Sequence, residues 1–130
     1  MTRDDLLSSL RLPLMAAPMS IASNVALVGA ASRAGVMGCF PTHNAHRDAA
    51  NGGLRGWISR LDAGIDAARE AGGAPAPYAV NINVSRQKPA DVLADELDAC
   101  RGLPVITTNA GDPAEVVKQV RDWGGLVISI

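Results

Sequence analysis

The chain has 130 residues, and its 12 lysines and arginines against 13 aspartates and glutamates give a formal net charge of −1. Nucleic-acid-binding domains normally carry a basic excess or a basic stripe, so this balance argues against a nucleic-acid partner. Hydrophobic residues at 48% and charged residues at 19% indicate a globular protein rather than a disordered one.

Strand-like apolar runs alternate with helical spacing along the whole chain. In chain order the sequence predicts a helix over residues 2–10, a strand over 12–17, a helix between Ser23 as N-cap and Gly35, a strand over 36–40, a loop over 41–53, a helix over 54–71, a strand over 78–84, a helix over 89–100, a strand over 104–108, a helix over 113–123 and a strand over 126–130. No tight hairpin signal joins two strands, and the strands are plain apolar runs. The sequence therefore predicts an α/β fold with a parallel sheet covered on both faces.

The last helix has the clearest local start signal. Asp112 is predicted as its N-cap, Pro113 as its first residue, and Glu115 as the third helical residue that completes a capping box.

Several other classes of protein are disfavoured. No apolar run approaches the ~20 residues of a membrane span, and the start MTRDDLLSSL is acidic where a signal peptide would be basic. We therefore expect a cytoplasmic protein with no membrane partner. Cys39 and Cys100 form neither a disulfide framework nor a metal-binding spacing. No GxGxxG or GxxxxGK[ST] segment indicates a dinucleotide-binding Rossmann domain or a P-loop.

Four ordered segments of the chain carry a family resemblance. The first is LMAAPM over residues 14–19, followed by a helix ending in Ala34-Gly35 and by VMGCF over 36–40. The others are YAVNI over 78–82 and PVITTNAGDP over 104–113. This set resembles the nitronate monooxygenase family, the 2-nitropropane dioxygenase-like flavoproteins. That family has a strand ending in A-P-M, a helix ending in A-G, and strands of the G-x-G-F-L, F-G-V-N-L and P-V-V-S kinds.

The resemblance implies an FMN-dependent (β/α)8 TIM barrel and an enzyme, a flavin-dependent monooxygenase that oxidises alkyl nitronates with O2. A typical barrel takes ~250 residues. Residues 1–130 are therefore expected to form the N-terminal part of one FMN-binding barrel domain, with about five of its eight βα units.

The resemblance also implies which residues bind FMN. In the family, the backbone around A-P-M lies against the flavin ring, and the asparagine of V-N-L contacts the cofactor. The matching residues here are Ala17, Pro18, Met19 and Asn81.

Barrel sites form at the C-terminal ends of the strands, and this adds two candidates. Asn109, which follows the fourth strand, is expected to bind the cofactor, and His43, just after the second, to contact a small-molecule substrate. Asn83 is expected to point the same way as Asn81 by the two-residue strand period. The family's general base is a histidine at the end of its sixth strand, so we expect the catalytic residues to lie outside residues 1–130.

Other polar residues have competing interpretations. His43, His46 and Asp48 form an H-x-x-H-x-D set, but no further ligand is placed by the sequence, and we expect no metal site. Arg86 and Lys88 could meet an anion such as a phosphate, or lie in a solvated loop.

Three alternative functions remain open from the sequence. Within the same fold, the chain could belong to a related FMN enoyl-acyl-carrier-protein reductase or to an NAD(P)H:quinone reductase. A different class is a non-catalytic incomplete barrel that self-associates as a homo-oligomer, because five parallel strands leave two open edges.

Overall fold

Five parallel strands form one curled sheet in the computed structural model, which describes all residues from Met1 to Ile130. The strands are neighbours in sequence order, each paired in parallel with the next. They are β1 (Met15–Ala16), β2 (Met37–Pro41), β3 (Ala79–Asn83), β4 (Val105–Asn109) and β5 (Leu126–Ser129). This order confirms the predicted parallel fold of the TIM-barrel type, with five of its eight strands present.

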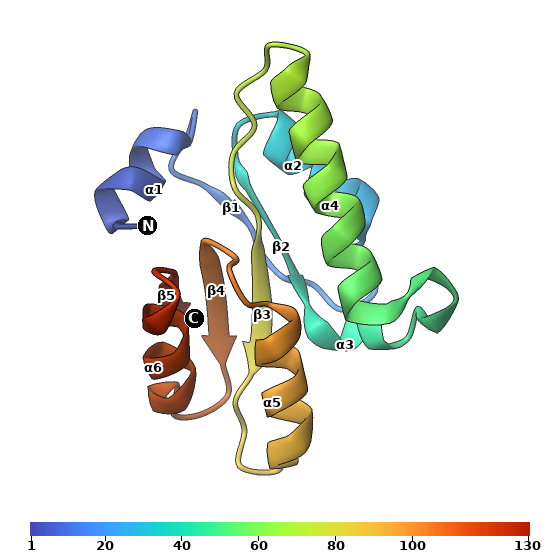
Figure 1. Ribbon diagram of the computed structural model, residues 1–130, viewed down its shortest axis with the longest axis vertical. Helices are drawn as coiled ribbons and strands as arrows, with labels where there is room; N and C mark the ends of the chain where they lie inside the picture. The colour runs from blue at the N-terminus through green and yellow to red at the C-terminus, as the bar shows by residue number, and fades with distance from the viewer.

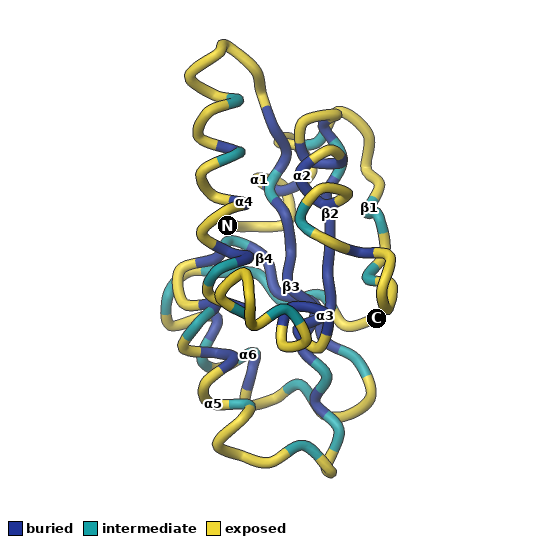
Figure 2. The backbone as a smooth tube through the Cα atoms, turned by 90° about the vertical axis from the view of Figure 1, so that its right-hand side faces the viewer, coloured by how far each residue is buried: buried dark blue, intermediate teal, exposed yellow.

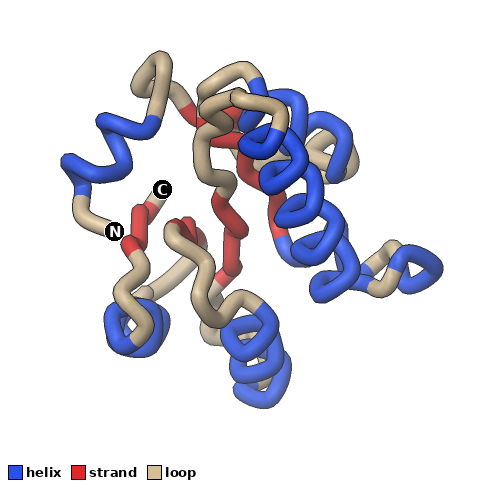
Figure 3. The backbone as a smooth tube through the Cα atoms, turned by 45° about the horizontal axis from the view of Figure 1, so that its top comes forward, coloured by secondary structure: helices blue, strands red, loops and turns tan.

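Helices alternate with the strands, and all but the first cover the outer side of the curl (Figure 1; Figure 3). They are α1 (Arg3–Ser9), α2 (Val25–Arg33), α3 (Thr42–His46), the 3-10 helix η1 (Ala49–Asn51), α4 (Gly53–Glu70), α5 (Ala90–Ala99) and α6 (Ala114–Asp122). None of them combines the length and the hydrophobicity needed to cross a lipid bilayer.

The sheet separates two hydrophobic clusters, one on each face. The outer cluster has 18 buried residues and joins alternate strand residues such as Val80 and Ile106 to α4, α5 and α6. The inner cluster has five, in which Leu6 of α1 packs against residues of β2, β3 and β4. Figure 2 shows β2, β3 and β4 as buried tubes. Because both faces are covered, these strands are apolar runs without alternation.

Helix α2 lies directly on β2 because Gly38 leaves room for it. A Cβ at Gly38 would lie 2.6 Å from the backbone oxygen of Val28. Any side chain at this position would therefore push α2 away from the sheet and displace the loop that joins it to β1.

The predicted loop over residues 41–53 is wrong. Helix α3 and η1 occupy most of it, and Thr42, Asn44 and Ala45 of α3 are buried. Tertiary packing determines the conformation of this segment, because the fully buried Ala45 holds a short helix that shows no apolar periodicity.

Two predicted helix caps are also wrong. The N-cap of α2 is Asn24, whose side chain accepts from the N–H of Leu27 at 2.9 Å, and Ser23 makes other contacts. At α6 the N-cap is Pro113, and the helix begins at Ala114. Asp112 accepts from the N–H of Ala114, and Glu115 accepts from Gln119 and closes no capping box.

The first predicted strand is much shorter than its apolar run. Only Met15 and Ala16 pair with β2, and Leu12 and Leu14 are 51% and 58% exposed. With one neighbouring strand instead of two, β1 lacks the second row of backbone hydrogen bonds that would extend it.

A buried carboxylate joins α3 to α5. Glu96 is 1% exposed, and its two oxygens meet His46 Nε2 at 2.8 Å and the Lys88 ammonium. The Lys88 side chain is itself 14% exposed, so this ion pair is largely removed from water. A buried charge is tolerated only when it is paired in this way.

We predict that Lys88→Met destabilises the chain by about 3–5 kcal/mol, because it leaves a buried carboxylate without its ammonium partner. The double variant Lys88→Met/Glu96→Leu should recover most of this loss, since neither charge is then buried. Urea midpoints at one fixed protein concentration measure both effects. The neighbouring exposed Arg86→Met is the control and should shift stability by less than about 0.5 kcal/mol. Equal stability of Lys88→Met and Arg86→Met would contradict the prediction.

Candidate functional site

A hollow of about 400 Å³ opens at the C-terminal ends of the strands. Residues that end or follow all five strands line it: Ala17, Pro18, Ser20, Pro41, His43, Asn81, Asn109 and Ile130. We call it the C-terminal hollow. Parallel strands bring their carboxyl ends to one edge of the sheet, and this edge carries the active sites of barrel enzymes.

Five of the six residues predicted from the sequence lie around this hollow: Ala17, Pro18, His43, Asn81 and Asn109. Met19 does not line it. The Met19 side chain is 44% exposed, and its backbone is bonded within the loop between β1 and α2. The structure therefore brings most of the predicted residues together, while their binding of a cofactor or substrate stays a prediction.

Three polar side chains form a layer at the base of the hollow, on the inner face of the sheet. Asn81 is 4% exposed and donates from Nδ2 to Thr107 Oγ1 at 3.0 Å. The same Thr107 oxygen lies 3.4 Å from Cys39 Sγ. Burial raises the pKa of the Cys39 thiol to about 11, so it is neutral at physiological pH and unsuited to nucleophilic attack.

Asn109 holds an unsatisfied hydrogen-bond acceptor at the hollow. Its Oδ1 is buried and has no donor within the chain. Leaving a buried acceptor unpaired costs about 1–3 kcal/mol. An N–H donor on a bound molecule would remove that cost, so the position of Asn109 favours a ligand with such a group.

His43 and Ser20 connect two loops across one side of the hollow. Their Nε2 and Oγ atoms lie 2.8 Å apart in a hydrogen bond. Desolvation lowers the pKa of His43 below its usual value, and the positive charges of Arg47, His46 and Lys88 act in the same direction. Glu96 opposes them with a smaller effect. The imidazole is therefore neutral at physiological pH and can accept or donate a hydrogen bond.

Two buried side chains that the sequence did not indicate as site residues hold the loop between β1 and α2. Ser23 accepts from the Met19 N–H at 2.8 Å and donates to the Ala17 carbonyl at 3.3 Å. Asn44 of α3 bonds three backbone groups of the same loop. A serine and an asparagine in polar segments carry no periodic signal, and only their burial in the fold distinguishes them.

The three residues of the H-x-x-H-x-D set have separate partners. His43 bonds Ser20, His46 bonds Glu96, and Asp48 accepts from the Trp57 indole at 2.8 Å. No group of three or more His, Cys, Asp or Glu side chains is arranged to hold a metal ion.

Asn83 and Lys88 belong to a second hollow beside the first. It has a volume of about 360 Å³, and His43 lies between the two. Asn83 accepts from the Ser85 N–H at 2.8 Å and lines this second hollow rather than the C-terminal hollow. Lys88 is committed to Glu96 and is not a free solvated cation.

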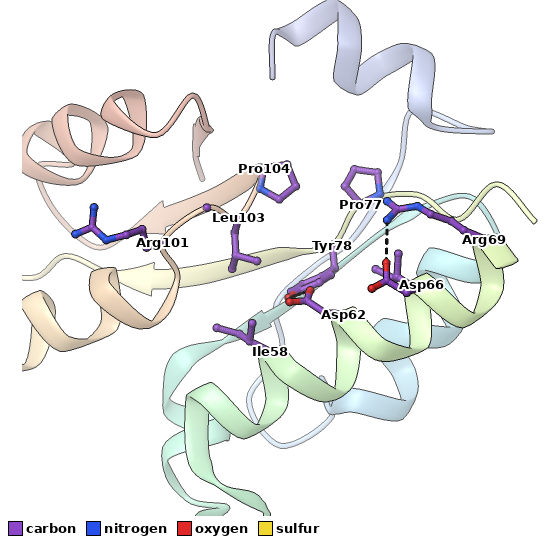
Figure 4. Close-up of a pocket in the computed structure, with 11 residues that line it drawn as sticks. Ile58, Asp62, Asp66, Arg69, Pro77, Tyr78, Arg101, Leu103 and Pro104 are labelled. Carbon is purple, nitrogen blue, oxygen red and sulfur yellow. Dashed lines mark hydrogen bonds and ion pairs between the residues drawn. The ribbon is translucent and has the colours of Figure 1, made fainter.

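A third hollow of about 350 Å³ lies at the opposite, N-terminal edge of the sheet (Figure 4). Tyr78, which is 2% exposed, donates to Asp62 at 2.8 Å, and Arg69 pairs with Asp66 beside it. These charged groups are partnered within the chain. In barrels this edge serves stability rather than catalysis, so we do not assign the functional site to it.

No family model matches the chain, and no curated protein matches its sequence. Among solved structures, the chain is similar to a single-substitution mutant of FabK from Thermotoga maritima, with 27% identity and a TM-score of 0.68. The match covers 96% of this chain and 37% of the FabK chain, so the chain spans little more than a third of that protein. The likeness extends over nearly the whole of this chain and agrees with the parallel strand order described above.

We predict that His43 titrates below the ordinary histidine pKa of about 6.5. Arg47→Gln should raise the pKa of His43, because it removes a nearby positive charge. The folded chain binds this proton less readily than the unfolded chain. The stability from neutral His43 is therefore present above about pH 6.5 and is lost as the pH falls through the folded pKa. Histidine ring NMR measures the titration. The control Arg60→Gln should leave it unchanged, and a His43 pKa at or above 6.5 in the unsubstituted chain would contradict the prediction.

Proposed function

We propose that the chain forms the N-terminal part of an FMN-dependent oxidoreductase, with FMN at the C-terminal hollow. The observation that carries this proposal is the set of uncharged residues, half of them polar, that five neighbouring strands place around one hollow. Its position matches the edge at which barrel enzymes bind their ligands. The structural likeness to FabK, an FMN enzyme, supports the same cofactor class.

The residues present fit the isoalloxazine ring of FMN, which has both N–H donor and carbonyl acceptor groups on its polar edge. The unpaired Oδ1 of Asn109 offers an acceptor for such a donor. The Asn81 carboxamide donates to Thr107, and this bond fixes its orientation at the base of the hollow. Ala17 and Pro18 supply small, uncharged walls beside them. When bound, FMN would supply the redox chemistry, and these residues would orient it.

The charge state of the hollow supports a role for the neutral His43. A neutral imidazole bonded to Ser20 can take up or release a proton beside a bound substrate without placing a fixed charge there. His43 is therefore proposed as a substrate-contacting residue. The resemblance places the general base of the family after a sixth strand, outside residues 1–130.

Two substrate classes fit this proposal. The sequence motifs favour oxidation of an alkyl nitronate with O2. The FabK likeness favours reduction of an enoyl group carried on acyl carrier protein. The two differ in the co-substrate, O2 in one and a nicotinamide reductant in the other. Oxygen consumption with a nitronate, against nicotinamide oxidation with an enoyl thioester, distinguishes them in the protein that contains this chain.

We predict that the protein that contains this chain binds FMN and that Asn109→Leu weakens the binding at least about tenfold, because the buried acceptor for the ring is lost. Quenching of flavin fluorescence on titration measures the dissociation constant. Asn51→Ala is the matched control, since Asn51 is exposed and bonds only Asp48. Absence of FMN binding by the unsubstituted protein that contains this chain would overturn the proposed function. Equal binding by the Asn109 and Asn51 variants would overturn the role of Asn109.

We also propose that residues 1–130, as an isolated polypeptide, self-associate through their open sheet edges. Strand β5 pairs only with β4, and Leu126, Val127 and Ile128 are each half-buried. Unpaired edges of apolar strands are templates for pairing with another chain.

Light scattering at several concentrations measures this association, and we predict a mass above that of the monomer. Val127→Lys should shift the distribution toward the monomer, because a charge on an edge strand discourages pairing. Lys118→Ala on α6 is the control and should leave the distribution unchanged. A single monomer peak with cooperative thermal unfolding would contradict the prediction.

A further inference from the structure

We propose that Asn44 is a positioning residue that fixes the loop between β1 and α2 in the conformation that lines the C-terminal hollow. Asn44 does not line the hollow itself. It would act through the backbone of residues 19–23, which it contacts from α3. This inference rests on the proposed function for its consequence in FMN binding, whereas its structural part can be tested without FMN.

The Asn44 carboxamide is matched to three backbone groups of the loop. Its Oδ1 accepts from the Ile21 N–H at 3.1 Å, and its Nδ2 donates to the carbonyls of Met19 at 2.9 Å and Ser23 at 3.0 Å. Asn44 is only 7% exposed, so water competes poorly for these bonds. The Asn44 side chain thus bonds backbone groups before, at and after the turn of the loop.

The loop needs this support because one of its residues is strained. Ile21 has a φ of 68°, in the left-handed region that a β-branched residue rarely adopts. Its side chain is 83% exposed, so packing does not offset the strain. The bond from the Ile21 N–H to Asn44 is the side-chain contact that holds this residue, beside two backbone bonds of the turn, from the Ala22 N–H to Ser20 and from the Ser23 N–H to Met19. Strained backbone that the surroundings hold in place is frequent at functional sites.

The consequence of this conformation lies at the hollow. On one side of the turn, the loop presents Pro18 to the C-terminal hollow and places the Ser20 hydroxyl 2.8 Å from His43. Asn44 and His43 are adjacent on α3, so the same short helix holds the loop and supplies its partner across the hollow. Ala45, fully buried, anchors that helix to the outer core. The position of the A-P-M segment is therefore set by the end of β2 as well as by β1.

The test compares Asn44→Ala and Asn44→Asp with the unsubstituted chain. Asn44→Asp keeps the acceptor for Ile21 but turns an oxygen toward the carbonyls of Met19 and Ser23. Amide hydrogen exchange at Ile21 reads the loop without FMN, and fluorescence titration reads FMN affinity. Circular dichroism confirms that each variant is folded at the temperature used. Tyr78→Phe, which loses a bond at the opposite edge of the sheet, is the control for general destabilisation.

We expect Asn44→Ala to lose at least about tenfold of the Ile21 amide protection and of the FMN affinity, and Tyr78→Phe to lose neither. Adding Ile21→Gly to Asn44→Ala should restore part of the FMN affinity, because glycine adopts a positive φ without strain. A residue that only stabilised the fold would show no such rescue.

Unchanged Ile21 protection in Asn44→Ala, or a loss of FMN affinity no greater than in Tyr78→Phe, would overturn the inference. If the unsubstituted protein that contains this chain binds no FMN, the proposed function fails. The exchange measurement then decides alone whether Asn44 holds the loop.

Discussion

The in-register parallel pairing of β3 with β4 is the constraint on which the rest of the site depends. It aligns Asn81 with Thr107 and Asn83 with Asn109. Ala79 and Val105, two residues earlier, pack in the inner cluster under Leu6. Because side chains alternate along a strand with a period of two, Asn81 and Thr107 lie on the same inner face as Ala79 and Val105, at the base of the hollow. A register shift of one residue would turn the asparagine side chains toward the helices of the outer face and Val80 and Ile106 toward the inner face. The hydrophobic pattern and the polar layer therefore favour the same strand register.

The opposite side of the hollow is built differently, because β1 is too short to fix the chain that follows it. Only two of its residues pair with β2. The loop after β1 is held instead by side chains, Ser23 from its own helix start and Asn44 from α3. One wall of the hollow thus depends on strand pairing and the other on buried hydrogen bonds. The wall formed by the loop after β1 is the more sensitive to single substitutions, since a few side-chain hydrogen bonds hold it in place of a row of backbone bonds between strands.

The sequence predicted the elements that have a periodic hydrophobic pattern and missed single side chains whose role depends on a tertiary contact. Apolar runs and helical spacing predicted every strand and most helices. Motif resemblance indicated Ala17 and Asn81, and position after a strand indicated His43, and these three residues lie around one hollow. Asn44 was missed because its segment shows no period. Glu96 was missed although it falls on the inward face of α5, because its burial depends on whether Lys88 can reach it. Such contacts between side chains can be identified only once the fold brings distant segments of the chain together.

The distribution of charge around the hollow limits what this part of the chain can bind. The residues lining it carry no fixed charge, since His43 is neutral at physiological pH. Lys88, the nearby cation that could have met a phosphate, is occupied by the buried Glu96. Electrostatic recognition of a phosphate needs free cations or a nest of backbone N–H groups. These strand ends are therefore suited to the neutral ring of a flavin rather than to its phosphate. In the proposed enzyme, the phosphate would have to be held by groups other than the residues that line this hollow.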